Sequence, residues 1–124
     1  MKITYFGHSF LLLQGEDYSI CLDPFGDIGL KIPNVVADYV FLSHNHYDHN
    51  NLSAVNYKKI VTNGENFEII PTFHDDEKGK LRGNNNVLLF GLDGYKIAFL
   101  GDYGESENPL LIEKLVGVDI LFLP

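Results

Sequence analysis

Hydrophobic and polar residues alternate in short runs along most of the chain, and this period of two is typical of β-strands. Glycine, proline, asparagine and aspartate residues separate the runs, as they do between strands. The pattern predicts strands at residues 2–6, 10–14, 18–23, 38–43, 59–62, 67–73, 87–90, 95–100 and 118–123. Residues 15–17 and 91–94 are expected to form hairpin turns, and residues 79–86 a polar loop.

Helical periodicity is convincing in only one segment, near the C-terminus. Asn108 can cap a helix, Pro109 suits its first position, and apolar residues follow at helical spacing up to Gly117. A second, shorter helix is expected from about Asp48 to Val55. Many strands and few helices, without a repeat or a linker, predict a single strand-rich α+β domain over residues 1–124.

Length, charge and cysteine content exclude several classes of protein. The chain has 124 residues, enough for one hydrophobic core, and nine Lys and Arg against seventeen Asp and Glu give a charge of −8, which argues against nucleic-acid binding. No apolar run approaches the roughly 20 residues of a membrane span. Cys21 is the only cysteine and is expected in the core, so no internal disulfide can form. With no signal-peptide pattern at the N-terminus, these features favour a cytoplasmic protein.

Three of the five histidines lie within six residues, directly after a predicted strand. In extended backbone His44 and His46 point the same way. A helix beginning near Tyr47 would turn Asp48 and His49 back toward them, and its N–H groups would attract an anion. Imidazole and carboxylate ligands in one place suit zinc or a similar divalent ion, and they also accept manganese or iron. A solvated polar loop is the simpler alternative, but the density of ligands after a strand favours a metal site.

The order of four motifs along the chain resembles that of the metallo-β-lactamase superfamily. The main motif is the histidine cluster after an apolar strand, His44-x-His46-x-Asp48-His49. Its companions are an aspartate that closes an early strand, a lone histidine after a strand and an aspartate that ends a later strand: Asp23, His74 and Asp102. The resemblance extends over residues 7–123, and it implies a fold of the αββα sandwich type.

The resemblance implies two adjacent divalent metal ions, most simply zinc, and it assigns their ligands. The first ion would be held by His44, His46 and His74. The second would be held by Asp48, His49 and Asp102, with Asp102 bridging the two ions. Two such ions can share a hydroxide and polarise the bond that it attacks. Asp48 would be the catalytic residue that orients or deprotonates this water.

Asp23 is expected to support the ligands by hydrogen bonds from behind, and His8 either to do the same or to line the site. Taken alone, each candidate outside the histidine cluster has a simpler explanation. Asp23 and Asp102 fit turn residues. His74 fits a hydrogen-bonded surface residue, and His8 fits a structural histidine equally well. The order of the motifs is therefore what favours the metal site.

The function implied by the resemblance is hydrolysis by a metal-bound hydroxide at an ester, lactone or phosphodiester bond. Gly7-His8-Ser9 resembles the branch that contains ascorbate-phosphate lactonases and N-acyl-phosphatidylethanolamine phospholipases D. The substrate would accordingly be a small molecule or a phosphoester. The alternative is a catalytically incomplete metal-binding or interaction module derived from such a hydrolase.

The superfamily fold is usually considerably longer than this chain, and its fifth motif is a further histidine near the C-terminus. All five histidines are already assigned, so no residue here corresponds to that motif. We therefore expect the chain to represent the N-terminal half of the fold. Its exposed apolar sheet face would then need a partner, either another copy of the chain in a homo-oligomer or the missing C-terminal half.

Overall fold

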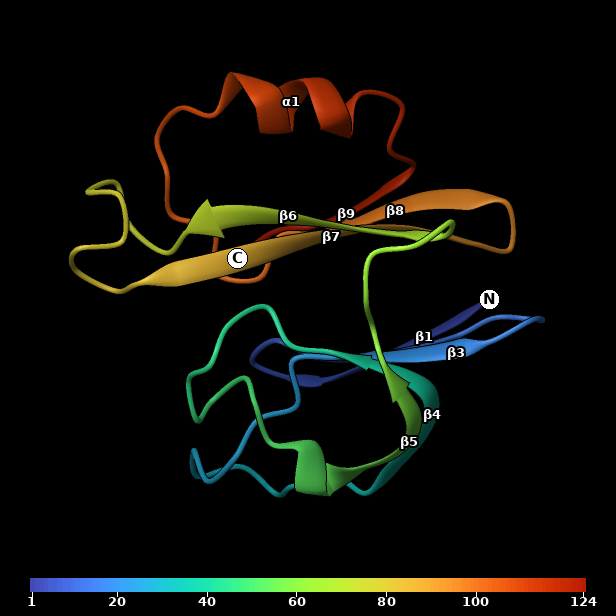
Figure 1. The fold of residues 1–124 in the computed structure, drawn as a ribbon. Coiled ribbons are helices and arrows are strands. Elements are labelled where there is room, and N and C mark those ends of the chain that lie inside the picture. Colours follow the sequence, from blue (N-terminus) through green and yellow to red (C-terminus); the bar gives the residue numbers. More distant parts are fainter. The chain divides into compact units, whose positions relative to one another are not determined.

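The computed structural model describes residues 1–124, which form two compact units, Met1–Val61 and Thr62–Pro124. The first unit contains a five-stranded sheet in the order β1-β2-β3-β4-β5, and the second a four-stranded sheet in the order β6-β7-β8-β9 (Figure 1). A single α-helix is present, so the predicted strand-rich α+β fold is confirmed. None of the helices combines the length and the apolar character that crossing a bilayer requires.

The sheet of the first unit combines antiparallel and parallel pairing. Its strands are β1 (Lys2–Gly7), β2 (Phe10–Gln14), β3 (Ser19–Leu22), β4 (Val35–Phe41) and β5 (Val55–Ile60). Strands β1, β2 and β3 pair antiparallel, whereas β4 and β5 join the sheet in parallel. The parallel pairing of β4 with β5 begins with Val35 opposite Val55. Both strands therefore start earlier in the sequence than their hydrophobic runs predicted.

Aromatic packing forms the centre of the first unit's core. Phe10 and Phe25 are fully buried, and their ring centroids are 5.3 Å apart in an edge-to-face arrangement. Phe6 packs against Phe10 at 4.9 Å. The remaining buried members of this cluster are Leu12, Cys21, Val35, Ala37, Val40, Ala54 and Val55. Each aromatic ring contributes more apolar area than an aliphatic side chain, so these rings dominate the stability of the unit.

Cys21 lies in this core, as predicted, and its thiol is fully buried. Burial, with a smaller contribution from the charge of Asp23, raises the pKa of the thiol to about 12. Because the thiolate is the reactive form, we expect the folded protein not to react with the thiol reagent DTNB in mildly alkaline buffer, and to react fully once denatured. Reaction of the folded protein at the rate of free cysteine would contradict this burial.

The second unit consists of a mixed sheet with one helix packed on it (Figure 1). Its elements are β6 (Phe67–Phe73), β7 (Asn84–Leu92), β8 (Tyr95–Phe99), α1 (Pro109–Leu115) and β9 (Ile120–Phe122). Strands β6, β7 and β8 are antiparallel, and β9 joins β8 in parallel. The helix buries Leu111 in a cluster with Val87, Leu89, Ala98 and Leu100.

Both ends of α1 are satisfied by specific hydrogen bonds. The side chain of Asn108 accepts from the Leu111 N–H at 3.0 Å, which confirms the predicted cap. At the other end, the Lys96 ammonium donates to the Lys114 and Val116 carbonyls at 3.1 and 2.9 Å. These carbonyls have no partner within the helix, so a lysine from β8 takes that place.

Two predicted segments have a different structure. The helix expected from about Asp48 to Val55 is wrong, because only one 3-10 turn, η1 (Leu52–Ala54), forms there. The Asn51 N–H donates to the Pro24 carbonyl at 2.9 Å, and the chain is already extended in β5 from Val55, so the segment is too short for the predicted helix. The loop expected at residues 79–86 is also wrong in its last part, since β7 begins at Asn84.

Candidate metal centre

The four histidines of the first unit form one continuous row of rings. Ring centroids are 4.5 Å apart for His46 and His44, 4.2 Å for His44 and His49, and 4.8 Å for His49 and His8. A tight turn produces this arrangement in place of the expected helix, because the His49 N–H donates to the His46 carbonyl at 2.8 Å. Residues of the predicted metal motif therefore converge without a helix N-terminus beside them.

Asp23 supports this row from the interior. Its fully buried carboxylate accepts from the Ser43 N–H at 2.7 Å and the Ser43 hydroxyl at 2.5 Å, and it lies 2.7 Å from His49 Nδ1. Burial raises the pKa of Asp23 above its ordinary value, while hydrogen bonds from His49 and Ser43 act in the opposite direction. A carboxylate only accepts hydrogen bonds. His49 Nδ1 therefore donates, and the lone pair of that ring lies on Nε2.

Ser43 has a supporting role that sequence reasoning missed. Its buried hydroxyl lies 2.7 Å from His44 Nδ1 while it donates to Asp23. Since the hydroxyl has only one proton, Nδ1 of His44 is the donor in that contact, and the lone pair of this ring lies on Nε2 as well. The only signal in the sequence is that a serine directly precedes His44. One buried carboxylate thus sets the tautomers of two histidines.

His8 contacts Asp48 and His49, the last two residues of the motif. Its Nε2 lies 3.0 Å from Asp48 Oδ2 and 3.2 Å from His49 Nε2. The latter two atoms are 3.5 Å apart. The sequence left open whether His8 supports the ligands or lines the site, and in the structure its ring nitrogen contacts both residues directly.

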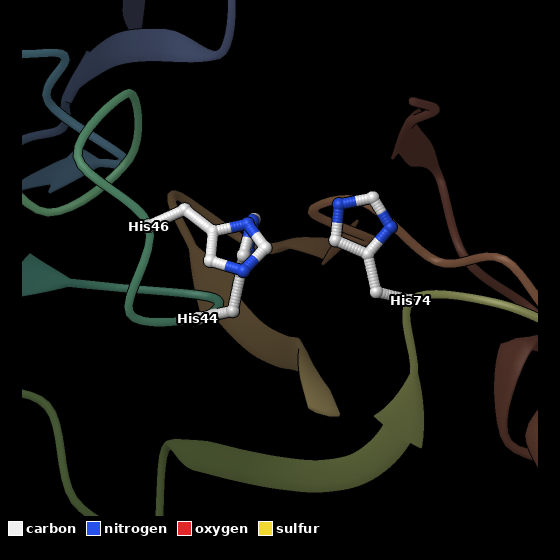
Figure 2. A group of neighbouring side chains, drawn as sticks. All are labelled: His44, His46 and His74. Carbon is white, nitrogen blue, oxygen red and sulfur yellow. The ribbon is translucent and has the colours of Figure 1, made fainter. Parts of the chain in front are cut away.

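The two remaining predicted residues lie in the second unit. His74 follows β6, and its Nε2 lies 2.9 Å from Asp102 Oδ2, on the turn after β8. Both side chains are mostly buried. Figure 2 draws the His74 ring at the end of its strand, and it shows His44 and His46 on the loop that follows β4. Within each unit, therefore, the predicted residues are in mutual contact.

A carboxylate next to His74 organises the loop that follows it. Asp75 accepts hydrogen bonds at 2.7–3.0 Å from four backbone N–H groups, those of Glu77, Gly79, Leu81 and Arg82. Burial by itself would raise the pKa of Asp75, but these four donors outweigh it and lower the pKa to about 2. Asp75 is therefore a charged anchor for the loop. The presence of Asp75 after His74 is thus explained by the loop, and Asp75 needs no role as a metal ligand.

Two residues that the sequence did not single out position His74 and Asp102. Asn85 is fully buried and accepts from the Asp102 N–H at 3.0 Å. Gly104 passes so close to His74 that a Cβ atom there would lie 2.5 Å from the His74 carbonyl carbon. Any larger residue at Gly104 would displace the backbone of His74.

Comparison with known proteins gives matches along the whole chain. Residues 2–124 match the family model of the β-lactamase superfamily domain. A UPF0173 metal-dependent hydrolase from Geobacillus sp. WCH70 is 27% identical in an alignment 164 positions long, gaps included, which covers 100% of this chain and 73% of that protein. Another protein of that name, from Methanospirillum hungatei, is 27% identical and 69% covered.

Solved structures agree on the fold. A candidate Zn-dependent hydrolase of the metallo-β-lactamase superfamily from Thermotoga maritima matches with a TM-score of 0.70 and 32% identity over 96% of this chain. A candidate metal-dependent hydrolase from Parabacteroides distasonis has a TM-score of 0.65 over 98% of this chain; at 23% identity it supports the fold alone. The chain spans 58% of the length of the Thermotoga protein.

Proposed function

Because the chain belongs to the β-lactamase superfamily domain family, we propose that it acts as a metal-dependent hydrolase. The observation that carries this proposal is the contact between His44, His46 and His49 on one loop, with Asp23 fixing the tautomers of two of them. Neutral imidazoles with a defined lone pair, next to the carboxylate of Asp48, suit a borderline divalent cation. The donor set therefore fits the metal that the family implies.

The proposed ligands divide between two ions, and zinc is the metal that the name of the Thermotoga protein suggests. We propose that the first ion is held by His44, His46 and His74. The second is held by Asp48 and His49, with Asp102 as a ligand common to both ions. The contacts within each unit support these sets. When bound, the ions supply Lewis acidity, which lowers the pKa of a water molecule and polarises the bond under attack.

Asp48 is the proposed catalytic carboxylate. Its side chain is 26% exposed, so it is open to water while it contacts the buried His49. A carboxylate in that position can orient a water molecule and accept its proton. Asp23 cannot take this role because it is fully buried and already bound to Ser43 and His49.

The proposed substrates are esters, lactones or phosphodiesters of small molecules. Gly7-His8-Ser9 supports this choice through its resemblance to the lactonase and phospholipase D branch. The chain covers only part of the length of its relatives. For this reason we also propose that full activity requires a second copy or the C-terminal remainder of a longer protein.

The test combines metal removal with assays on two classes of substrate. Protein stripped by a chelator and reloaded with zinc, manganese or iron is assayed on bis-p-nitrophenyl phosphate and on a panel of lactones. We expect turnover only after reloading, and its loss in His46→Ala. The exposed Asn56→Ala variant on β5 serves as the control and should keep the wild-type rate. Turnover that survives chelation, or that is unchanged in His46→Ala, would contradict the proposed mechanism.

A metal-binding module without turnover is the second candidate. It is favoured because this chain matches only 58% of the length of the Thermotoga protein. In that case the protein would bind zinc, and His46→Ala would bind it more weakly, but no substrate of the panel would be cleaved. If a longer form of the protein carrying the same residues cleaved the panel, the module would be one part of a hydrolase. Metal analysis by mass spectrometry verifies in the same samples that zinc is bound, and the turnover assay then decides between the two candidates.

A further inference from the structure

The ring of His8 faces the same point as two proposed metal ligands. We propose that His8 is itself a direct ligand and that His8, Asp48 and His49 form a three-ligand cation site contained in the first unit. This inference rests on the proposed function for the identity of the cation as zinc or a similar divalent ion. It gives His8 a direct role, where the sequence predicted a supporting, lining or structural one.

The distances between the three donor atoms match those of a tetrahedral zinc site. Zinc bonds to nitrogen and oxygen are about 2.0–2.1 Å long, so two ligand atoms in a tetrahedral site are about 3.3 Å apart. The three separations here are 3.0 Å for His8 to Asp48, 3.2 Å for His8 to His49 and 3.5 Å for His49 to Asp48. One cation can therefore bind all three atoms with shifts of a few tenths of an ångström.

Counting protons argues against a purely hydrogen-bonded cluster. His49 donates through Nδ1 to Asp23, so its Nε2 faces the cluster as an acceptor. The Asp48 carboxylate also accepts only. A proton on His8 Nε2 would have to serve both acceptors at once, as a shared and weaker hydrogen bond. A cation satisfies the three lone pairs together, which a single proton cannot do.

The backbone at His8 is held in an unfavourable conformation that brings the ring to this place. Its φ angle is +51°, in the left-handed region that few residues other than glycine adopt, although asparagine, aspartate and histidine are found there more often than the rest. The pairing of β1 with β2 shifts between Tyr5 and Gly7, and the Tyr5 hydroxyl donates to the His8 carbonyl at 2.8 Å. Such strain persists where the surrounding structure fixes it, and it is concentrated at functional sites.

The three side chains range from fully buried to partly exposed, as expected for a metal site that is fixed on one side and open to solvent on the other. The side chain of His49 is fully buried, that of Asp48 is 26% exposed and that of His8 is 37% exposed. A cation bound by them would be anchored on the interior side and open to solvent next to His8. Three ligands from the first unit leave the fourth position of a tetrahedral site for a further ligand.

The experiment measures zinc affinity and coordination in variants of His8. His8→Asn tolerates the left-handed backbone but removes the imidazole, and Ser9→Ala is the neighbouring control. Isothermal titration with zinc should show a loss of affinity of at least about tenfold in His8→Asn and none in Ser9→Ala. The visible spectrum of the cobalt-loaded protein should change only in His8→Asn. In the cadmium-loaded wild type, NMR should show coupling between the metal and Nε2 of His8. Protection of Cys21 from DTNB verifies that each variant is folded.

The outcomes separate this inference from the proposed function. If wild-type protein binds no zinc, both fail. If His8→Asn keeps the wild-type zinc affinity and cobalt spectrum while turnover is intact, the hydrolase stands and the ligand role of His8 is wrong. If cadmium couples to His8 and affinity falls in His8→Asn, but no substrate is cleaved, the ligand role stands and the hydrolase fails.

Discussion

Replacing Asp23 by alanine is expected to lower the free energy of unfolding by about 3–5 kcal/mol, which is typical for removal of one partner from a buried ionic hydrogen-bond network. The side chain is fully buried, and its removal leaves two hydrogen-bond donors of Ser43 and the Nδ1–H of His49 without an acceptor. Each unsatisfied buried donor costs about 1–3 kcal/mol. Urea unfolding followed by circular dichroism measures the loss directly.

The control for this prediction is a second carboxylate in the same unit. Asp38 also accepts hydrogen bonds, from Ser19 and Lys58, but its side chain is 32% exposed, so water can replace it. Asp38→Ala should therefore be less destabilising than Asp23→Ala. Asp23→Asn keeps one acceptor oxygen, so its loss of stability should lie between those of the two alanine variants. Its zinc affinity should fall about 10–100-fold, because the tautomer of His49 is no longer fixed. Equal stability of the two alanine variants would show that the network around Asp23 contributes little.

Replacing Asn85 by alanine is expected to cost about 2–4 kcal/mol, since three buried hydrogen bonds disappear together. Asn85 donates to the Leu100 carbonyl at 2.9 Å and to the Thr72 hydroxyl at 3.0 Å, and it accepts from the Asp102 N–H at 3.0 Å. Besides the stability loss, hydrogen exchange at the Asp102 amide should accelerate. The exposed neighbour Asn84→Ala should change stability by less than about 0.5 kcal/mol. An unchanged exchange rate at Asp102 would contradict the positioning role of Asn85.

The sequence predicted correctly those elements whose ends are set by residues next to them in the chain. Strands β2 and β6 were predicted at their observed residues because turn residues flank clear hydrophobic runs. Helix α1 was predicted because its cap and first proline are adjacent in sequence. The short helix after Asp48 was wrong for the opposite reason. The bond from Asn51 to the Pro24 carbonyl and the start of β5 at Val55 come from distant parts of the unit, and no local pattern reports them.

The candidate site divides in the same way. The convergence of His44 and His46 follows from their spacing on extended backbone, so it could be predicted. The positions of Ser43, Asn85 and Gly104 beside the proposed ligands depend on contacts across strands, and residues of these types are common elsewhere in the chain. His8 contacts Asp48, which is 40 residues away, through a shift in strand pairing that hydrophobic periodicity does not reveal.

The left-handed backbone at His8 and Asp23 has a consequence for how this protein can evolve. Both residues have positive φ angles, +51° and +43°, although neither is glycine. Each of these two residues therefore meets two requirements at once, one for the conformation of the main chain and one for the chemistry of the side chain. Glycine and asparagine satisfy the first but lose the second, and β-branched residues fail at the first. Divergent descendants of this protein would thus change these two positions last, or would abandon them together with the loop of histidines that they support.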